Sequence, residues 1–177
     1  VTLNVNGKDH SLELEPRAPD RDTVHFEMGN LLGELGRFEE AADEYRRAIE
    51  ISPDYAVAWL NLSRALADQN RFPEAIDAVG RALTIHPDWG DAVQQLSRIH
   101  KQFGSALASG GELEAAGEQF RRSVELTPDS SSSCYLLAKA LAQTGNANEA
   151  VEYYSRAIAG RRAFPEAHYE LGILLLD

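Results

Sequence analysis

Apolar residues recur along most of the chain at intervals of three, four and seven positions, which is the spacing of amphipathic α-helices. One series consists of Phe26, Leu31, Leu32 and Leu35, and a second runs through residues 39–51. Gly36-Arg37 separates the two series, and Ser52-Pro53-Asp54 follows the second. Because glycine and proline end helices, this pattern predicts a pair of helices joined by a tight turn.

The helix pair repeats along the chain. Pro53-Asp54 and Pro87-Asp88 lie thirty-four residues apart, and apolar positions recur at the same interval. The predicted units are residues 22–55, 56–89, 90–130 and 131–164, with a partial unit at 165–177. One helix pair cannot bury its apolar face alone, so neighbouring units are expected to stack.

The unit at residues 90–130 is seven residues longer than the others. Seven residues are close to two helical turns, and adding them inside a helix keeps its apolar face in phase to within about 20°. The sequence therefore predicts a long first helix over residues 90–109, ended by Gly110-Gly111.

The best-matched unit carries a specific set of residues, namely Trp59, Leu62, Leu66, Ala75, Ala82 and Pro87. In this respect residues 22–177 resemble the tetratricopeptide repeat family, with Arg162 departing from the pattern where proline is usual. The resemblance implies an all-α fold, a right-handed superhelical solenoid of helix–turn–helix repeats. It also implies a concave groove lined by the first helix of each unit, which in this family binds peptides or other proteins.

Residues 1–21 are predicted to form a short β-hairpin and a linker. Apolar and polar residues alternate around Asn6-Gly7, a strong two-residue hairpin turn. If Val5 pairs with Lys8, one face carries Val1, Leu3, Val5, His10, Leu12 and Leu14. An isolated hairpin is marginal in water, so this face is expected to rest on the first repeat, the groove or a second copy.

Composition narrows the classes of partner. Seventeen basic and twenty-eight acidic residues give a net charge of −11. This charge disfavours binding to nucleic acid, because the phosphate backbone is itself negative. The chain holds one cysteine and has no run of eighteen apolar residues, so neither a disulfide framework nor membrane insertion is expected. The ends, Val1 and Leu176-Asp177, suggest a piece of a longer protein, and the lone cysteine slightly favours a cytoplasmic location.

The sequence contains no recognisable catalytic motif. His25, His168 and Cys134 occupy the position of Trp59 in their units, which packs between helices, so buried or boundary roles are expected. Ser130 to Ser133 has the pattern of a helix N-terminus. No spacing of histidines or cysteines suits a metal. We therefore expect no enzyme activity, no cofactor and no metal in this chain.

The resemblance places candidate binding residues on the first helices. Positions implied to face the groove include Phe26, Asn30, Leu60, Asn61, Arg64, Gln94, Arg98, Tyr135, Lys139 and Tyr169. Arg64, Arg98 and Lys139 would form a row of cations that favours an acidic peptide or a terminal carboxylate. Alternatively, Glu34, Asp68 and Asp91 pair with these cations. The four residues Phe26, Leu60, Tyr135 and Tyr169 would be exposed anchors beside the row.

The function expected from these features is that of a protein-interaction scaffold. Two alternatives remain open, namely a regulatory or substrate-recruiting arm of a larger enzyme and a self-assembly module. Assembly would use the N-terminal hairpin or the uncovered apolar end at residues 173–176.

Overall fold

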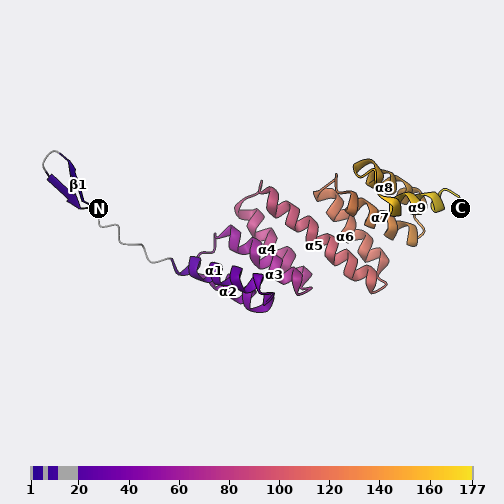
Figure 1. Ribbon diagram of the computed structural model, residues 1–177. Helices are drawn as coiled ribbons and strands as arrows, with labels where there is room; N and C mark the ends of the chain where they lie inside the picture. Colours follow the sequence, from indigo (N-terminus) through magenta and orange to yellow (C-terminus); the bar gives the residue numbers. More distant parts are fainter. Residues whose placement is uncertain (1, 6–7, 12–19, 177) are drawn as a thin grey trace.

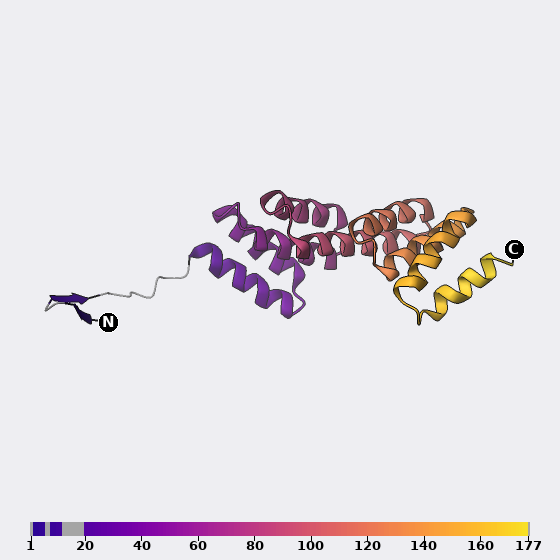
Figure 2. The ribbon, with the colours of Figure 1, turned by 90° about the horizontal axis from the view of Figure 1, so that it is seen from above.

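The computed structural model describes residues 2–5, 8–11 and 20–176. Residues 20–176 form a solenoid in which each helix packs against the next along the chain. Figures 1 and 2 show the helices following one another along an elongated array, with α1 at one end and α9 at the other. The helices are α1 (Arg21–Glu34), α2 (Phe38–Ile51), α3 (Ala56–Asp68), α4 (Phe72–Ile85), α5 (Gly90–Ser109), α6 (Leu113–Leu126), α7 (Ser131–Gln143), α8 (Ala147–Gly160) and α9 (Pro165–Leu174).

The turns inside the helix pairs share one backbone feature. Gly36, Asn70, Gly111 and Gly145 all have positive φ, between 59° and 85°. This left-handed conformation suits glycine and, to a lesser degree, asparagine, which explains the choice of residue at the turn. Helix α5 spans residues 90–109, so the prediction of a long helix ended by Gly110-Gly111 is confirmed.

Near the N-terminus the structure describes two short antiparallel strands, β1 (Thr2–Val5) and β2 (Lys8–Ser11). Their register places Val5 opposite Lys8 and Leu3 opposite His10. The predicted packing of this segment concerns side chains outside the described part of the chain.

Small side chains let the helices approach closely. Ala41, Ala48, Ala75, Ala82, Ala116, Ala150 and Ala157 are fully buried on the second helices. A glycine of the first helix meets an aromatic ring of the second in two pairs of helices. Gly29 lies under the Tyr45 ring, and Gly104 lies under the Phe120 ring, so closely that neither site has room for a Cβ atom.

The apolar core is divided into two clusters. One extends from Phe26 of α1 to Ile99 of α5, and the other from Ala116 of α6 to Ala167 of α9.

Three buried hydroxyl groups and one half-buried hydroxyl group lie where the two clusters meet, and we call this set the hydroxyl seam. It consists of Ser97, Ser123, Thr127 and Ser133. The Ser97 Oγ atom lies 2.9 Å from Ser123 Oγ and 2.6 Å from Thr127 Oγ1. The Ser123 Oγ atom lies 2.9 Å from Ser133 Oγ. Since every hydroxyl has a partner, the seam has no unsatisfied polar group among its members.

Candidate functional site

Three hollows follow one another along the face of the solenoid formed by α1, α3, α5 and α7. The first, the α1–α3 hollow, has a volume of about 480 Å³ and contains Asn30, Asn61 and Arg64. The second, the central hollow, has a volume of about 560 Å³ and lies among α3, α5 and α7. The third, the α5–α7 hollow, measures about 320 Å³. The central hollow shares Asp68 with the first and Ser105 with the third, so the three make one groove.

The α1–α3 hollow is organised around Asn30. Its Oδ1 atom accepts hydrogen bonds of 2.9 Å from the Tyr45 hydroxyl and from Asn61 Nδ2. Arg64 Nη1 donates in turn to Asn61 Oδ1 at 3.1 Å. This chain of bonds holds the exposed Arg64 guanidinium over α3 while leaving most of its N–H donors free for another group.

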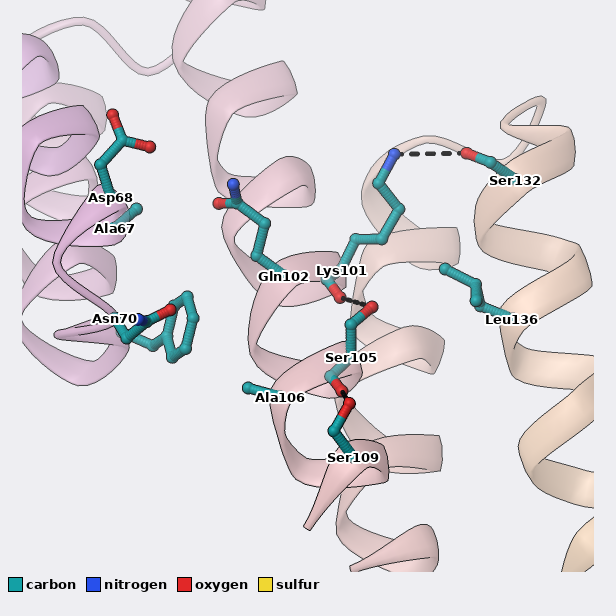
Figure 3. A pocket seen from close by; sticks show the side chains of 11 residues that line it. Ala67, Asp68, Asn70, Lys101, Gln102, Ser105, Ala106, Ser109, Ser132 and Leu136 are labelled. Atoms are coloured by element: carbon teal, nitrogen blue, oxygen red, sulfur yellow. Dashed lines mark hydrogen bonds between the residues drawn. The ribbon is translucent and has the colours of Figure 1, made fainter. Parts of the chain in front are cut away.

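The central hollow is lined by polar groups of α5 (Figure 3). Lys101 Nζ reaches across to α7 and donates to Ser132 Oγ at 3.3 Å. The Ser105 and Ser109 hydroxyls donate to carbonyls one turn earlier in α5, so their oxygen lone pairs can still accept. The Gln102 side chain extends from α5 toward α3, and its Oε1 atom has no hydrogen-bond partner among the described residues.

Charge is distributed unevenly along the groove. The α1–α3 hollow contains three carboxylates, from Glu27, Glu34 and Asp68, and one cation, Arg64. The central hollow is lined by Lys101 and by Asp68, the carboxylate that it shares with the α1–α3 hollow, and the charged group of the α5–α7 hollow is Lys139. The groove is therefore acidic at its α1–α3 end and basic at its α5–α7 end.

The cations predicted or observed to line the groove form no ion pair within the described part of the chain. Among the described residues, Arg64, Arg98, Lys101 and Lys139 take part in no salt bridge. Glu34, Asp68 and Asp91 likewise form none with the described part of the chain. The alternative in which these acids pair with the cations is not seen in the structure.

The expectation that Phe26 and Leu60 are exposed anchors is wrong. Phe26 is only 9% exposed and packs against the rings of Tyr45 and Tyr55, while Leu60 is 2% exposed. Both side chains lie on the side of their helix that meets its neighbours, so they belong to the core.

The two tyrosines predicted as anchors differ from each other. Tyr135 is half-buried, with its ring centroid 4.8 Å from that of Phe164. Tyr169 is 69% exposed on α9.

The insertion in α5 changes which residues face the groove. Gln94 and Arg98 are exposed on α5 but do not line any of the three hollows. Lys101 and Ser105, which the sequence analysis did not select, line the central hollow. Gly104 packs under Phe120 in the same way as Gly29 packs under Tyr45, so the two glycines occupy equivalent positions. Ser105 follows Gly104 as Asn30 follows Gly29. Aligning the units on their second helices would therefore have identified Ser105 as the counterpart of Asn30.

The residues considered for chemistry lie in different surroundings. Cys134 is buried, and burial raises the pKa of its thiol. Ser130 caps α7 by accepting a bond from the Ser133 backbone N–H, as predicted. His25 is half-buried with Nδ1 2.6 Å from Glu44 Oε2. His168 is exposed, so the expectation of a buried or boundary position is wrong for this residue. No cluster of His, Cys, Asp or Glu able to hold a metal occurs among the described residues.

Comparison with known families agrees with the helix-pair architecture. Two family models, both described as tetratricopeptide repeat, match residues 26–92 and 131–159. Together these ranges cover more than half of the chain. The chain belongs to the tetratricopeptide repeat family. The unmatched stretch between the two ranges, residues 93–130, contains most of the long helix α5 of this tetratricopeptide repeat protein.

Solved structures of similar fold include MamA proteins. A crystal structure of MamA has a TM-score of 0.64 and 19% identity, covering 89% of this chain and 82% of MamA. MamA residues 41–end from Desulfovibrio magneticus RS-1 give a TM-score of 0.64 at 16% identity, covering 89% of this chain and 85% of that one. At these identities the likeness shows the tetratricopeptide repeat fold alone.

A curated relative is the protein O-mannosyl-transferase TMTC1 of Homo sapiens. It is 36% identical over 55 residues, which is 30% of this chain and 6% of TMTC1. This chain thus matches only a small part of that relative. Within the described part of this chain, none of the helices has the length and apolar character needed to span a bilayer.

Proposed function

We propose that this tetratricopeptide repeat chain is a protein-interaction module whose groove binds an extended or helical segment of another protein. The observation that carries the proposal is the continuity of the three hollows along α1, α3, α5 and α7. Their polar side chains are held by hydrogen bonds at Asn30 and Ser132 but are not paired with opposite charges. Such preorganised and partly unsatisfied groups favour a polar ligand.

The charge distribution defines the chemistry of the segment. Lys101 and Lys139 favour acidic side chains in the partner, whereas Glu27, Glu34 and Asp68 favour basic ones. We infer a ligand that carries an acidic cluster and a basic cluster, with the acidic cluster over α5–α7. This refines the acidic peptide expected from the sequence, since the α1–α3 end of the groove would repel a uniformly acidic ligand.

Selection from a random displayed peptide library tests this proposal. The wild-type chain should enrich peptides that combine an acidic and a basic cluster. A Lys101→Glu/Lys139→Glu variant should lose the preference for the acidic cluster, because like charges now face it. The matched control, Arg81→Glu/Arg122→Glu, changes exposed residues of the second helices by the same net charge and should retain the preference. Identical enrichment with all three baits would overturn the proposal.

A second candidate function is a substrate-recruiting arm of a larger enzyme. The observation that favours it is the 55-residue match to a protein named as an O-mannosyl-transferase. The groove would then hold a segment of the enzyme's substrate. Adding a peptide selected by the groove to the full-length parent enzyme should competitively raise its KM for protein substrate. An unchanged KM would contradict the arm hypothesis while leaving the binding module intact.

A third candidate is self-assembly through the C-terminal end of the array. Tyr169, Ile173, Leu175 and Leu176 are exposed there, and exposed apolar groups near one another favour association. Light scattering over a range of protein concentrations tests this candidate. A mass that stays monomeric throughout would contradict it.

A further inference from the structure

Helix α9 lies at the end of the array and is exposed along one face (Figure 2). The helix packs on the rest of the solenoid through Ala167, Leu171 and Leu174, which are buried or half-buried. With about 3.6 residues per turn, Tyr169 and Gly172 fall on the opposite side of α9, and both are exposed. We define the α9 face as these two residues and the exposed apolar residues beside them, namely Ile173, Leu175 and Leu176.

The position of Gly172 is covered by an aromatic ring in two other units. Gly104 lies two repeats of thirty-four residues before Gly172, and Gly29 holds the same place in the first unit. An added Cβ atom would lie 2.7 Å from the Phe120 ring at Gly104 and 2.6 Å from the Tyr45 ring at Gly29. At Gly172 the same atom would meet nothing within 4 Å. Gly172 is therefore a position shaped to receive a ring, and the described part of the chain supplies none.

The position of Tyr169 is likewise covered in other units. Phe26 holds this position in the first unit, and Tyr135 holds it thirty-four residues before Tyr169. Each contacts a ring of the following second helix with centroids 5.9 Å apart, in the pairs Phe26–Tyr45 and Tyr135–Tyr154. Phe26 is 9% exposed, whereas Tyr169 is 69% exposed. Helix α9 thus presents an uncovered ring and an uncovered glycine three residues apart.

We propose that the α9 face binds the α9 face of a second copy, with the Tyr169 ring of each copy over Gly172 of the other. A two-fold axis between the copies places the two helices antiparallel, as in the helix pairs joined by short turns within this chain. In this orientation the contact between ring and glycine is made twice. The inference rests on the self-assembly candidate above and specifies the helix and the register that the second copy uses.

Three observations favour a second copy over a helix of another protein. The ring and the glycine that receives it lie on one face, so this face is complementary to itself, as a two-fold interface requires. Both helices are already formed, whereas an unfolded peptide must lose conformational entropy before it packs. None of the residues that make up the α9 face carries a charge, so the contact itself brings no like charges together.

The size of the α9 face sets the expected strength of the dimer. Its four large apolar side chains are 41–89% exposed and offer an area on the order of a few hundred Å². A typical stable interface buries roughly 800 Å² per partner. We therefore expect a reversible dimer with a dissociation constant of roughly 10–100 µM.

Sedimentation velocity tests the pairing, at protein concentrations from about tenfold below to about tenfold above this range. The wild-type chain should shift from the mass of one chain to the mass of two. Gly172→Ala should weaken the dimer about tenfold or more, because the added methyl group occupies the place of the partner's ring. Tyr169→Ala should also weaken the dimer, because it removes that ring.

Controls separate the interface from the fold. In a single chain the methyl group of Gly172→Ala meets nothing, and alanine favours a helix over glycine, so the melting temperature of the monomer should not fall. Gly80→Ala makes the same change on α4, where a Cβ atom also meets nothing, and should leave the dimer unchanged. Leu31→Gln changes an exposed side chain of α1 and should likewise leave the dimer unchanged.

Three outcomes would overturn the proposal. The mass of one chain at every concentration would overturn it together with the self-assembly candidate. A dimer as strong in Gly172→Ala and Tyr169→Ala as in the wild type would overturn the pairing alone, and loss of that dimer in Leu31→Gln would assign it to α1. Growth beyond two chains would contradict a closed two-fold contact. None of these outcomes bears on whether the groove binds a protein segment.

Discussion

The contact between Gly104 and Phe120 sets the distance between α5 and α6. A Cβ atom added at Gly104 would lie 2.7 Å from Cε1 of the Phe120 ring and 3.1 Å from the carbonyl oxygen of Ala116. The ring is almost fully buried and the carbonyl belongs to the backbone, so neither can move aside freely. We therefore predict that Gly104→Ala destabilises the solenoid.

The magnitude follows from two opposing effects. Replacing a glycine inside a helix by alanine stabilises the helix by about 1 kcal/mol. Overpacking a filled core costs about 1–3 kcal/mol. Gly80 of α4 offers a matched control, because a Cβ atom there would meet nothing within 4 Å. Gly80→Ala should show only the stabilisation of the helix by alanine, without the cost of overpacking. Gly80→Ala and Gly104→Ala should therefore differ by about 1–3 kcal/mol in the free energy of unfolding.

Thermal unfolding followed by far-ultraviolet circular dichroism measures this difference. For a chain of this length, about 2 kcal/mol corresponds to a separation of roughly 4–8 °C between the two melting temperatures. Gly29→Ala provides a second case, since its Cβ would lie 2.6 Å from the Tyr45 ring. Equal melting temperatures for Gly104→Ala and Gly80→Ala would refute the close approach of α5 and α6.

Three further predictions concern the seam, a turn and a buried histidine. Ser123→Ala removes a hydroxyl with two partners at 2.9 Å and should cost about 1–3 kcal/mol in urea unfolding, whereas Ser155→Ala on the surface should cost less than about 0.5 kcal/mol. Gly145→Ala, at φ 82°, should lower stability by about 1–2 kcal/mol in the same assay, whereas Asn70→Gly at the corresponding turn should cause no loss. Burial lowers the pKa of His100 in the folded chain below its ordinary value of 6.5. As the pH falls, the unfolded chain is therefore protonated at this histidine before the folded chain is. The free energy of unfolding falls as the pH drops through about 6.5 toward the pKa of the folded state. His100→Gln should flatten the decline in melting temperature between about pH 7 and pH 5.5, and an unchanged slope would contradict this assignment.

The helices and turns could be predicted because each has a local sequence pattern, namely helical apolar spacing or a glycine at the turn. Gly36, Gly111 and Gly145 stand where the backbone must be left-handed, and such positions are visible without a structure. The long helix α5 could be predicted because one unit is seven residues longer than the others, and seven residues add close to two full helical turns.

The groove residues were harder to predict because they depend on packing between units. Counting from the start of α5 selected Arg98, but α6 packs on the later part of that helix through Gly104, so Lys101 and Ser105 lie in the central hollow. The burial of Phe26 depends on Tyr45 and Tyr55, which lie beyond α1 in the sequence. Spacing within one helix does not reveal contacts of this kind.

The hydroxyl seam has a mechanical consequence. In the contacts between Ser97, Ser123, Thr127 and Ser133 side chains, either oxygen can act as donor. Small displacements of α5, α6 and α7 can therefore be accommodated by rotating hydroxyls, without opening an apolar contact to water. We expect the array to flex at this joint more readily than within either apolar cluster. Flexing there would change the separation between the acidic and basic ends of the groove. Under the proposed function, partners with different spacings between their charged clusters would then fit the same groove.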